Sequence, residues 1–179
     1  MQVRLANDLQ LEYESFGHPE APAILLIMGL GAQMLRWNVE ICEGLVDAGY
    51  RVIRFDNRDC GLSTRFDDAP IPAVGDIITA LKSGRTPTVP YTLDDMAADC
   101  IGLLDALGID AAHVVGISMG GAIAQLIAAH HAPRVRSLTC LMASSGNLAL
   151  PGPTPEAAGA LFAPLPRDRS RDSIVADGI

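Results

Sequence analysis

The sequence predicts an α/β protein with a mostly parallel sheet and helices on both of its faces. Two largely apolar runs, 23–28 and 113–117, each lead into a glycine-containing turn, as strands covered on both faces commonly do. Apolar residues recur at helical spacing in three further segments, 38–48, 92–107 and 119–131. Strands that alternate with helices indicate βαβ units, whose ligands bind beyond the carboxyl ends of the strands.

The first two strands are expected at 3–5 and 9–16, because an Asn-Asp pair at 7–8 suits the tight turn of an antiparallel hairpin. Their polar content predicts a position at the edge of the sheet. The continuous apolar run 23–28 predicts the next strand, buried on both faces, and the glycines of the loop 29–31 mark its end.

Asn38 is expected to cap a helix that runs to about Ala48, because an asparagine side chain can accept hydrogen bonds from the free N–H groups of a first turn. Ile41 and Leu45 lie one turn apart and are expected on one face of this helix. Gly49 supplies the stop, and the apolar residues that follow it predict another buried strand.

That strand is expected at 50–55, before a polar turn at 56–63 and an irregular, proline-containing excursion at 69–90. Thr92 and Asp95 form a capping-box pattern. A helix is therefore expected to begin there and to end before the next glycine.

Residues 113–117 predict the strand that enters the motif Gly-Ile-Ser-Met-Gly at 116–120, and a helix follows the motif. Residues 135–142 predict one more strand. The chain is expected to divide into a core at 1–147 and the start of a cap or lid region at 148–179, whose last residues resemble the beginning of a helix.

Composition limits the classes of protein to consider. Of the 179 residues, 49% are hydrophobic and 19% charged, which is typical of one globular core rather than of a disordered chain. The formal net charge of −8 argues against a nucleic-acid partner and against an anionic membrane surface, since both select basic faces. The sequence shows neither a signal-peptide pattern nor a transmembrane run, so we expect a cytoplasmic protein.

The four cysteines show no C-x-x-C spacing, which would be typical of a metal site or a redox pair. Cys42, Cys100 and Cys140 lie in apolar periodic segments, and Cys60 lies in a loop. We therefore expect four reduced thiols, mostly in the core, with neither a metal nor a cofactor.

The strongest functional signal is the motif at 116–120, where a strand is expected to meet a helix. A G-x-S-x-G turn can hold Ser118 in a strained backbone conformation with its hydroxyl projecting, because glycines at 116 and 120 remove side chains that would clash there. The short pattern also occurs by chance, so the interpretation of Ser118 as a nucleophile depends on the segments around the motif. The alternative for Ser118 is a structural turn serine.

Four blocks together resemble the N-terminal part of an α/β-hydrolase-fold serine hydrolase. They are Met28-Gly29-Leu30-Gly31, where the family often has His-Gly-x; Asp56-x-Arg58-x-x-Gly61-x-Ser63; the helix 92–108; and Gly116-x-Ser118-x-Gly120-Gly121. Within the family, the chain is most similar to the esterase branch that contains aclacinomycin methylesterase. The resemblance covers residues 1 to about 150.

The resemblance implies cleavage of a carboxylic ester, or a related acyl bond of a small molecule, through an acyl-enzyme on Ser118. It implies that the backbone N–H groups of Leu30 and Met119 form the oxyanion hole. Met28, in place of the frequent histidine, keeps these donors but removes a polar side-chain contact from the loop. A serine nucleophile argues against the haloalkane dehalogenases and epoxide hydrolases of the family, which use an aspartate.

The polar turn carries charges near the expected site. We interpret Asp56, Arg58 and Ser63 as residues that hold the loop rather than as catalysts, because a carboxylate and a guanidinium so close in a loop most often anchor it. Asp59 stands where the family commonly has glycine, so the geometry of the turn is not predicted.

A base for the serine is missing. In this fold the triad runs in the order Ser, Asp or Glu, His, and no histidine follows His131. His130 and His131 lie at the far end of the helix that leaves Ser118, and His18 and His113 lie toward the other end of the strands. All four are interpreted as surface or loop residues.

Asp168, Asp172 and Asp177 follow the serine but lie in cap-like sequence, so none of them is assigned as the triad acid. The isolated chain is therefore expected to have little or no triad activity. Two other interpretations stay open: a natural short protein that binds a ligand without catalysis, and half of a site that another chain completes. An interrupted parallel sheet would also expose an edge beside 135–142, which predicts self-association or marginal stability.

Overall fold

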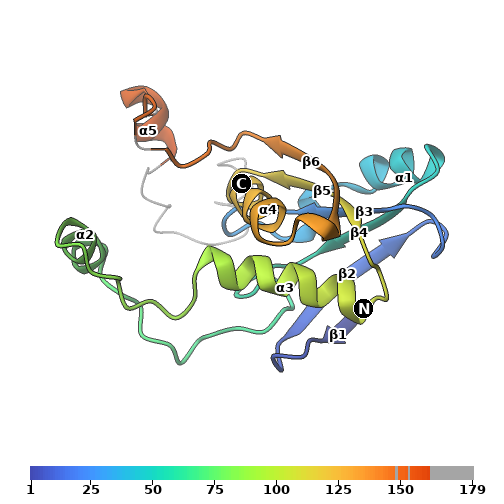
Figure 1. Ribbon diagram of the computed structural model, residues 1–179, viewed down its shortest axis with the longest axis horizontal. Coiled ribbons are helices and arrows are strands. Elements are labelled where there is room, and N and C mark those ends of the chain that lie inside the picture. The colour runs from blue at the N-terminus through green and yellow to red at the C-terminus, as the bar shows by residue number, and fades with distance from the viewer. Residues whose placement is uncertain (148, 153, 162–179) are drawn as a thin grey trace, which may run out of the picture. The chain divides into compact units, whose positions relative to one another are not determined.

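A six-stranded sheet with the order β1-β2-β4-β3-β5-β6 organises the chain (Figure 1). The computed structural model describes residues 1–147, 149–152 and 154–161. The strands are β1 (Gln2–Arg4), β2 (Gln10–Phe16), β3 (Ala23–Ile27), β4 (Arg51–Phe55), β5 (Ala112–Ile117) and β6 (Val135–Leu141). Strands β4, β3, β5 and β6 are parallel neighbours, whereas β1 and β2 pair antiparallel. The predicted α/β class with a mostly parallel sheet is confirmed.

Helices α1 (Val39–Asp47) on one face of this sheet and α3 (Leu93–Ala106) and α4 (Met119–His130) on the other cover both faces, as predicted. The described residues also form the helices α2 (Val74–Lys82) and α5 (Pro155–Leu161) and the short 3-10 turns η1 (Met34–Arg36) and η2 (Ala132–Arg134). The sheet and α1 to α4 belong to one compact unit, Met1–Ser145, and α5 belongs to a second, Gly146–Ile179. The helix expected at 172–179 lies outside the described residues.

The N-terminal hairpin forms as the Asn-Asp pair predicts. Asp8 adopts a φ of +67°, a left-handed conformation that a short polar side chain tolerates better than most. Strand β1 pairs only with β2 among the described residues, with Val3 opposite Leu11, and therefore forms one edge of the sheet.

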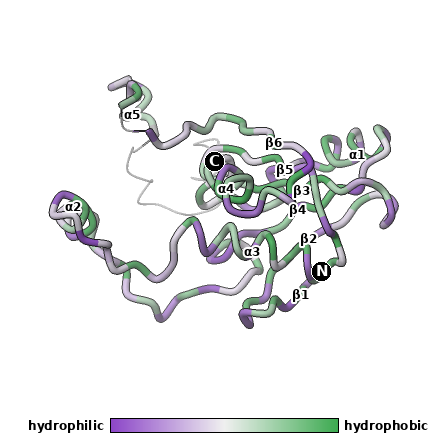
Figure 2. Tube along the Cα trace, in the orientation of Figure 1, coloured by the Kyte–Doolittle hydropathy of each residue, from purple (hydrophilic) through white to green (hydrophobic). Residues whose placement is uncertain are grey.

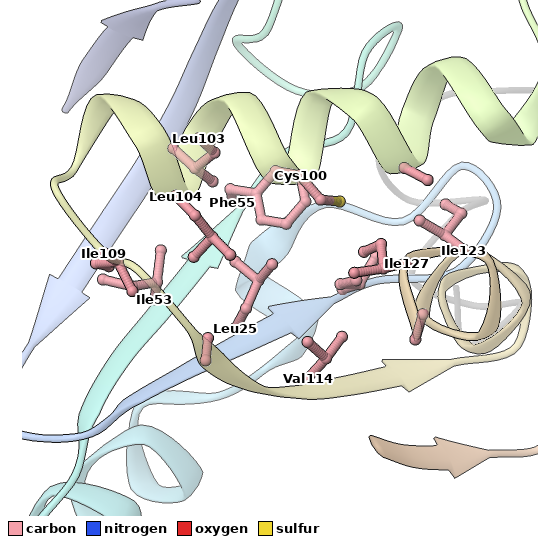
Figure 3. Packing of buried hydrophobic residues seen from close by; sticks show 14 of the residues in the cluster. Leu25, Ile53, Phe55, Cys100, Leu103, Leu104, Ile109, Val114, Ile123 and Ile127 are labelled. Atoms are coloured by element: carbon pink, nitrogen blue, oxygen red, sulfur yellow. The ribbon is translucent and has the colours of Figure 1, made fainter. Parts of the chain in front are cut away.

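The larger hydrophobic core lies between the sheet and the helices α3 and α4 (Figure 3). Its fully buried side chains include Leu25, Ile53, Phe55, Val114, Leu103, Leu104, Ile123 and Ile127. The residues of β3 are all buried, and the tube in Figure 2 is hydrophobic along β3 and over most of α4. This packing fixes the position of the β5–α4 junction, because both elements contribute to the same core.

Helix α1 covers the opposite face of the sheet, where Ile24, Leu26 and Val52 form a smaller core with Cys42. Helix α1 buries residue 42 completely and residues 45 and 46 in part, so these residues form its inward face. The side chain of Ile41 is 44% exposed.

The prediction that the segment 69–90 is irregular was wrong, since this segment contains helix α2. The prolines at 70 and 72 precede this helix and Pro87 follows it, so none of them interrupts its hydrogen bonds. Ile77 and Leu81 recur at helical spacing within it. The prolines on both sides of this short helix were therefore misread as evidence that the whole segment is irregular.

The predicted caps are confirmed. The side chain of Asn38 accepts a hydrogen bond from the Ile41 N–H at 3.1 Å. Thr92 and Asp95 form a reciprocal capping box, in which the Asp95 carboxylate accepts from the Thr92 N–H at 2.7 Å. These hydrogen bonds from the Thr92 side chain and backbone hold the pKa of Asp95 below its usual value.

All four cysteines are free thiols; Cys42, Cys60 and Cys100 are buried and Cys140 is exposed on β6. Burial raises the pKa of each buried thiol above its ordinary value. In the part of the chain that the structure describes, no set of three or more His, Cys, Asp or Glu side chains could hold a metal ion. No helix of that part has the length and apolar character needed to cross a bilayer.

Candidate active site

Ser118 occupies the sharp turn between β5 and α4 (Figure 1). Its backbone has φ +55° and ψ −122°, a strained combination for a residue with a side chain, and the residue is exposed. The Ser118 N–H donates to the Leu141 carbonyl of β6 at 2.8 Å, and its own carbonyl accepts from the Gly121 N–H at 2.9 Å. Hydrogen bonds on both sides thus hold the strained residue in place.

The glycines of the motif are required by close backbone approaches. A Cβ atom on Gly116 would lie 2.1 Å from the carbonyl oxygen of Gly120, and one on Gly120 would lie 2.2 Å from that of Ile27. A Cβ on Gly121 would lie 2.5 Å from the Cβ of Ala143. Helix α4 can therefore begin directly above β3 and β5 only where these side chains are missing.

The loop after β3 passes against the serine. A Cβ on Gly29 would lie 3.1 Å from the Cβ and 3.6 Å from the Oγ of Ser118, so the two backbones are nearly in contact. The N–H groups of Leu30 and Met119 donate to no protein acceptor within the described residues. The structure therefore brings together the three residues that the sequence singled out, Ser118, Leu30 and Met119.

Two side chains from the end of β4 hold this loop. The Asn57 side chain donates to the Met28 carbonyl at 3.0 Å, and the Asp56 Oδ1 atom accepts from the Met34 N–H at 2.8 Å. Both side chains are buried. Sequence reasoning did not single out Asn57, although a polar residue between a buried strand and Arg58 was a signal that could have found it. The loop is fixed at both ends without the histidine that often precedes its first glycine.

Asp56 also anchors the polar turn to which it belongs. Its Oδ2 atom accepts from the Leu62 N–H at 3.1 Å, and its backbone carbonyl accepts from the Ser63 hydroxyl at 2.6 Å. Gly61 has φ +52°, and a Cβ there would lie 1.9 Å from the Asp56 carboxylate. The interpretation of Asp56 and Ser63 as loop-holding residues agrees with these contacts.

Arg58 pairs with helix α3 rather than within its own turn. Its Nε and Nη2 atoms donate to the Asp99 carboxylate at 2.6 and 2.7 Å, and Nη2 also donates to the Asp95 carbonyl at 3.2 Å. Both charged side chains are buried, and the guanidinium lies against the rings of Phe66 and Tyr91. The role of Asp99 was not predicted from the sequence. It could have been found, because Asp99 lies on the apolar face of α3 and a buried carboxylate needs a charged or hydrogen-bonding partner.

A cavity of about 370 Å³ adjoins the serine turn. Its lining includes Gly29, Leu30 and Met119, from the two segments that meet at Ser118, and also Arg58, Asp59 and Tyr91. Its size lies within the range of small-molecule sites. The cavity and the two free N–H groups therefore belong to the same end of the sheet, where ligands of parallel α/β sheets bind.

The four histidines lie away from the serine, and three of them make side-chain contacts elsewhere. His113 Nδ1 lies 2.8 Å from the Ser137 hydroxyl, with its ring edge-on to Tyr50. His130 Nε2 lies 3.7 Å from Asp94, and His18 Nδ1 accepts from a backbone N–H in its own loop. His131 follows the last residue of α4.

None of these histidines contacts Ser118, although all four belong to the described part of the chain. The aspartates at 168, 172 and 177 lie outside the described residues. The site therefore contains a projecting serine and two free N–H donors, but no histidine that could take the hydroxyl proton.

Comparisons with known proteins place these features in a family. The profile of the alpha/beta hydrolase fold matches residues 22–175. The chain is 35% identical to rhodomycin D methylesterase DauP of Streptomyces sp. (strain C5) over 136 residues, which are 76% of this chain and 40% of that protein. It is 33% identical to 3-oxoadipate enol-lactonase 2 of Acinetobacter baylyi over 129 residues, 72% of this chain and 40% of the relative.

The solved structures give the same result. The enol-lactonase from Burkholderia xenovorans LB400 superimposes with a TM-score of 0.57 at 28% identity, over 75% of this chain and 44% of that chain. The chain thus spans about 40% of the length of these curated relatives.

Proposed function

The chain belongs to the α/β hydrolase fold family, and on that premise we propose that it carries the nucleophile and oxyanion hole of a serine hydrolase that cleaves carboxylic esters. The observation that carries this proposal is the strained, exposed Ser118 beside the free N–H groups of Leu30 and Met119. A methylesterase and an enol-lactonase among the relatives support an ester or lactone as the substrate class.

In the proposed reaction, the Ser118 Oγ atom attacks the acyl carbon of a small-molecule ester, and the carbonyl oxygen becomes a tetrahedral oxyanion. The N–H groups of Leu30 and Met119 donate to that oxyanion, and the positive N-terminal end of α4 favours the same charge. The bond from the acyl carbon to the alcohol oxygen then breaks, and the proton lost by the serine hydroxyl goes to that oxygen, so the alcohol leaves neutral. Water next attacks the acyl-enzyme, releases the acid and returns a proton to the Ser118 oxygen.

Asn57 and Asp56 support this chemistry without touching the substrate. They fix the two ends of the loop that contains Leu30, so its N–H is held beside the serine before an ester binds. Preorganised donors of this kind account for a large part of the rate in acyl transfer, because they need no rearrangement as the charge develops.

We further propose that the 179-residue chain by itself has little triad activity. His18, His113 and His130 make contacts away from Ser118, His131 follows the far end of α4, and no acid is assigned. Residues 148–179 are proposed to be the start of a cap or lid region. The exposed strand β6 is proposed to mediate self-association, since among the described residues it pairs with β5 alone and exposes Leu138 and Leu141.

The proposed nucleophile can be tested by phosphonylation, because a fluorophosphonate reacts with activated serines and leaves a stable mass increment. The purified chain is incubated with an alkyl fluorophosphonate, with and without imidazole as an external base, and the modified residue is located by peptide mass spectrometry. We expect labelling at Ser118 that imidazole accelerates and that Ser118→Ala abolishes. Ser137→Ala, which removes an exposed hydroxyl on β6, is the matched control and should label like the wild type.

Labelling that persists in Ser118→Ala would contradict the proposed nucleophile. Activity is tested separately with a short-chain p-nitrophenyl ester and no added base. Turnover by the wild type that Ser118→Ala abolishes would contradict the proposed lack of a complete triad while supporting the nucleophile.

A further inference from the structure

The lining of the cavity beside Ser118 includes charged and polar side chains that the proposed acyl transfer does not use. Arg58, Asp59 and Tyr91 line the same cavity as Leu30 and Met119. An ester that occupies the cavity would therefore place part of its acyl or alcohol group against these three side chains. Their charges decide which groups that part of a substrate can carry.

The positive charge of Arg58 is already neutralised. Its Nε and Nη2 atoms are bound to the Asp99 carboxylate at 2.6 and 2.7 Å, and its side chain is only 7% exposed. The two rings that flank it, Phe66 and Tyr91, further limit the approach of another anion to the guanidinium. Arg58 and Asp99 together add no net charge to the cavity wall.

Asp59 supplies the remaining charge. It has φ +61°, an uncommon conformation for a residue with a side chain, and the strain is maintained by the turn around it. One oxygen, Oδ1, accepts from the Phe66 N–H at 2.6 Å. The carboxylate also interacts with the Tyr91 hydroxyl, which, after burial, is a cause of the raised pKa of Tyr91. The wall of the cavity at the half-buried Asp59 therefore carries one negative charge that forms no ion pair with a cation of the described residues.

We propose that Asp59 determines substrate specificity, giving this cavity a preference for ester substrates that carry an ammonium or hydroxyl group over those that carry a carboxylate. A carboxylate has spare lone pairs for such donors, whereas an anionic group would meet repulsion and find Arg58 already paired. The inference rests on the proposed function in one respect, because the bound molecule is a substrate only if the site is catalytic. The preference itself belongs to the cavity and does not require a reactive serine.

The test measures binding and needs no turnover. Three probes of similar shape but different charge, benzylammonium, benzyl alcohol and benzoate, are titrated separately into the ¹⁵N-labelled chain at neutral pH and low salt. Dissociation constants are obtained from the amide shifts of Leu30, Asp59 and Met119. The variants are Asp59→Asn, which keeps the size of the side chain and tolerates positive φ, and Asp67→Asn, which removes the same charge from an exposed position.

We expect benzylammonium to bind about five- to tenfold more tightly than benzoate in the wild type and in Asp67→Asn. In Asp59→Asn the two constants should become equal within about twofold, while benzyl alcohol changes least. Tighter binding of benzoate, an unchanged preference in Asp59→Asn, or no saturable binding of any probe would each overturn the proposal.

Ser118→Ala separates this inference from the proposed function. The variant should keep the preference for benzylammonium, although it loses phosphonylation. A chain that is phosphonylated at Ser118 but shows no charge preference would overturn only the role of Asp59. A chain with the preference but without labelling would overturn only the proposed nucleophile.

Discussion

The side-chain amide of Asn57 donates a hydrogen bond of 3.0 Å to the backbone carbonyl of Met28, where β3 ends and the loop beside Ser118 begins. This bond joins the ends of two neighbouring parallel strands. With the Asp56–Met34 bond, it fixes a loop whose conformation decides where the Leu30 N–H lies.

Replacement of Asn57 by alanine should destabilise the fold and displace the loop. The Met28 carbonyl would lose its partner in a buried place, which costs about 1–3 kcal/mol. We expect that decrease in the free energy of unfolding by urea titration, together with slower phosphonylation of Ser118. Gln33→Ala is the control, because its side-chain amide lies in the same loop and makes no hydrogen bond among the described residues. Equal effects of the two substitutions would argue against a role for Asn57.

Loss of one partner of the buried Arg58–Asp99 ion pair should destabilise the fold. Asp99→Ala leaves a buried guanidinium without its carboxylate, so the free energy of unfolding should fall by about 3–5 kcal/mol. Asp67→Ala, which breaks the exposed pair with Arg65, should cost less than about 1 kcal/mol. The double variant Arg58→Met with Asp99→Leu should be more stable than Asp99→Ala, because it leaves no unpaired guanidinium. Equal stability of the two would show that the unpaired charge of Arg58 does not cause the loss of folding free energy.

Two glycine substitutions should act in opposite directions. Gly120→Ala would place a Cβ 2.2 Å from the Ile27 carbonyl, so we expect a loss of several kcal/mol or failure to fold. Gly44→Ala, inside α1 with nothing within 4 Å of the new Cβ, should raise the free energy of unfolding by up to about 1 kcal/mol. Thermal unfolding followed by circular dichroism measures both. Tolerance of Gly120→Ala would contradict the close approach of α4 to β3.

The hydroxyl of Tyr91 should lose its proton at an unusually high pH for a tyrosine. Burial and then the hydrogen bond to Asp59 disfavour the tyrosinate and raise the pKa of Tyr91 from 10.0 to about 12. Because this pKa is higher in the folded chain, the associated stability is complete below pH 10 and is lost as the pH rises toward 12. Absorbance at alkaline pH should show one late transition that Tyr91→Phe removes and Asp59→Asn shifts to lower pH. An unchanged midpoint in Asp59→Asn would exclude the contact.

The open edge β6 should make the chain associate. Leu138 is 41% exposed on this strand, and a lysine there should weaken pairing between edges. We expect sedimentation velocity to show concentration-dependent association of the wild type that Leu138→Lys reduces. Leu81→Lys on α2, a residue that is 61% exposed, is the control for the loss of an exposed leucine. A monodisperse wild-type monomer would contradict the proposal.

Local patterns in the sequence were sufficient for most of the fold. The apolar run at β3, the capping box of α3 and the glycines around Ser118 depend on neighbours within a few residues, so their backbone conformations follow from local chemistry. The error at 69–90 arose where local signals conflicted, because the prolines beside α2 indicated irregular structure although its own apolar residues have helical spacing. The helical period of α1 does not by itself reveal that Cys42 rather than Ile41 faces the sheet.

By itself, the sequence determined the α/β class, the strand-turn-helix around Ser118 and the absence of a histidine after His131. Only the tertiary structure decided that Asn57 holds the Met28 carbonyl and that Arg58 pairs with Asp99, 41 residues further along the chain. These partners meet because the packed core brings particular strand ends and helix faces together. That choice depends on long-range packing, which no pattern within a single segment contains.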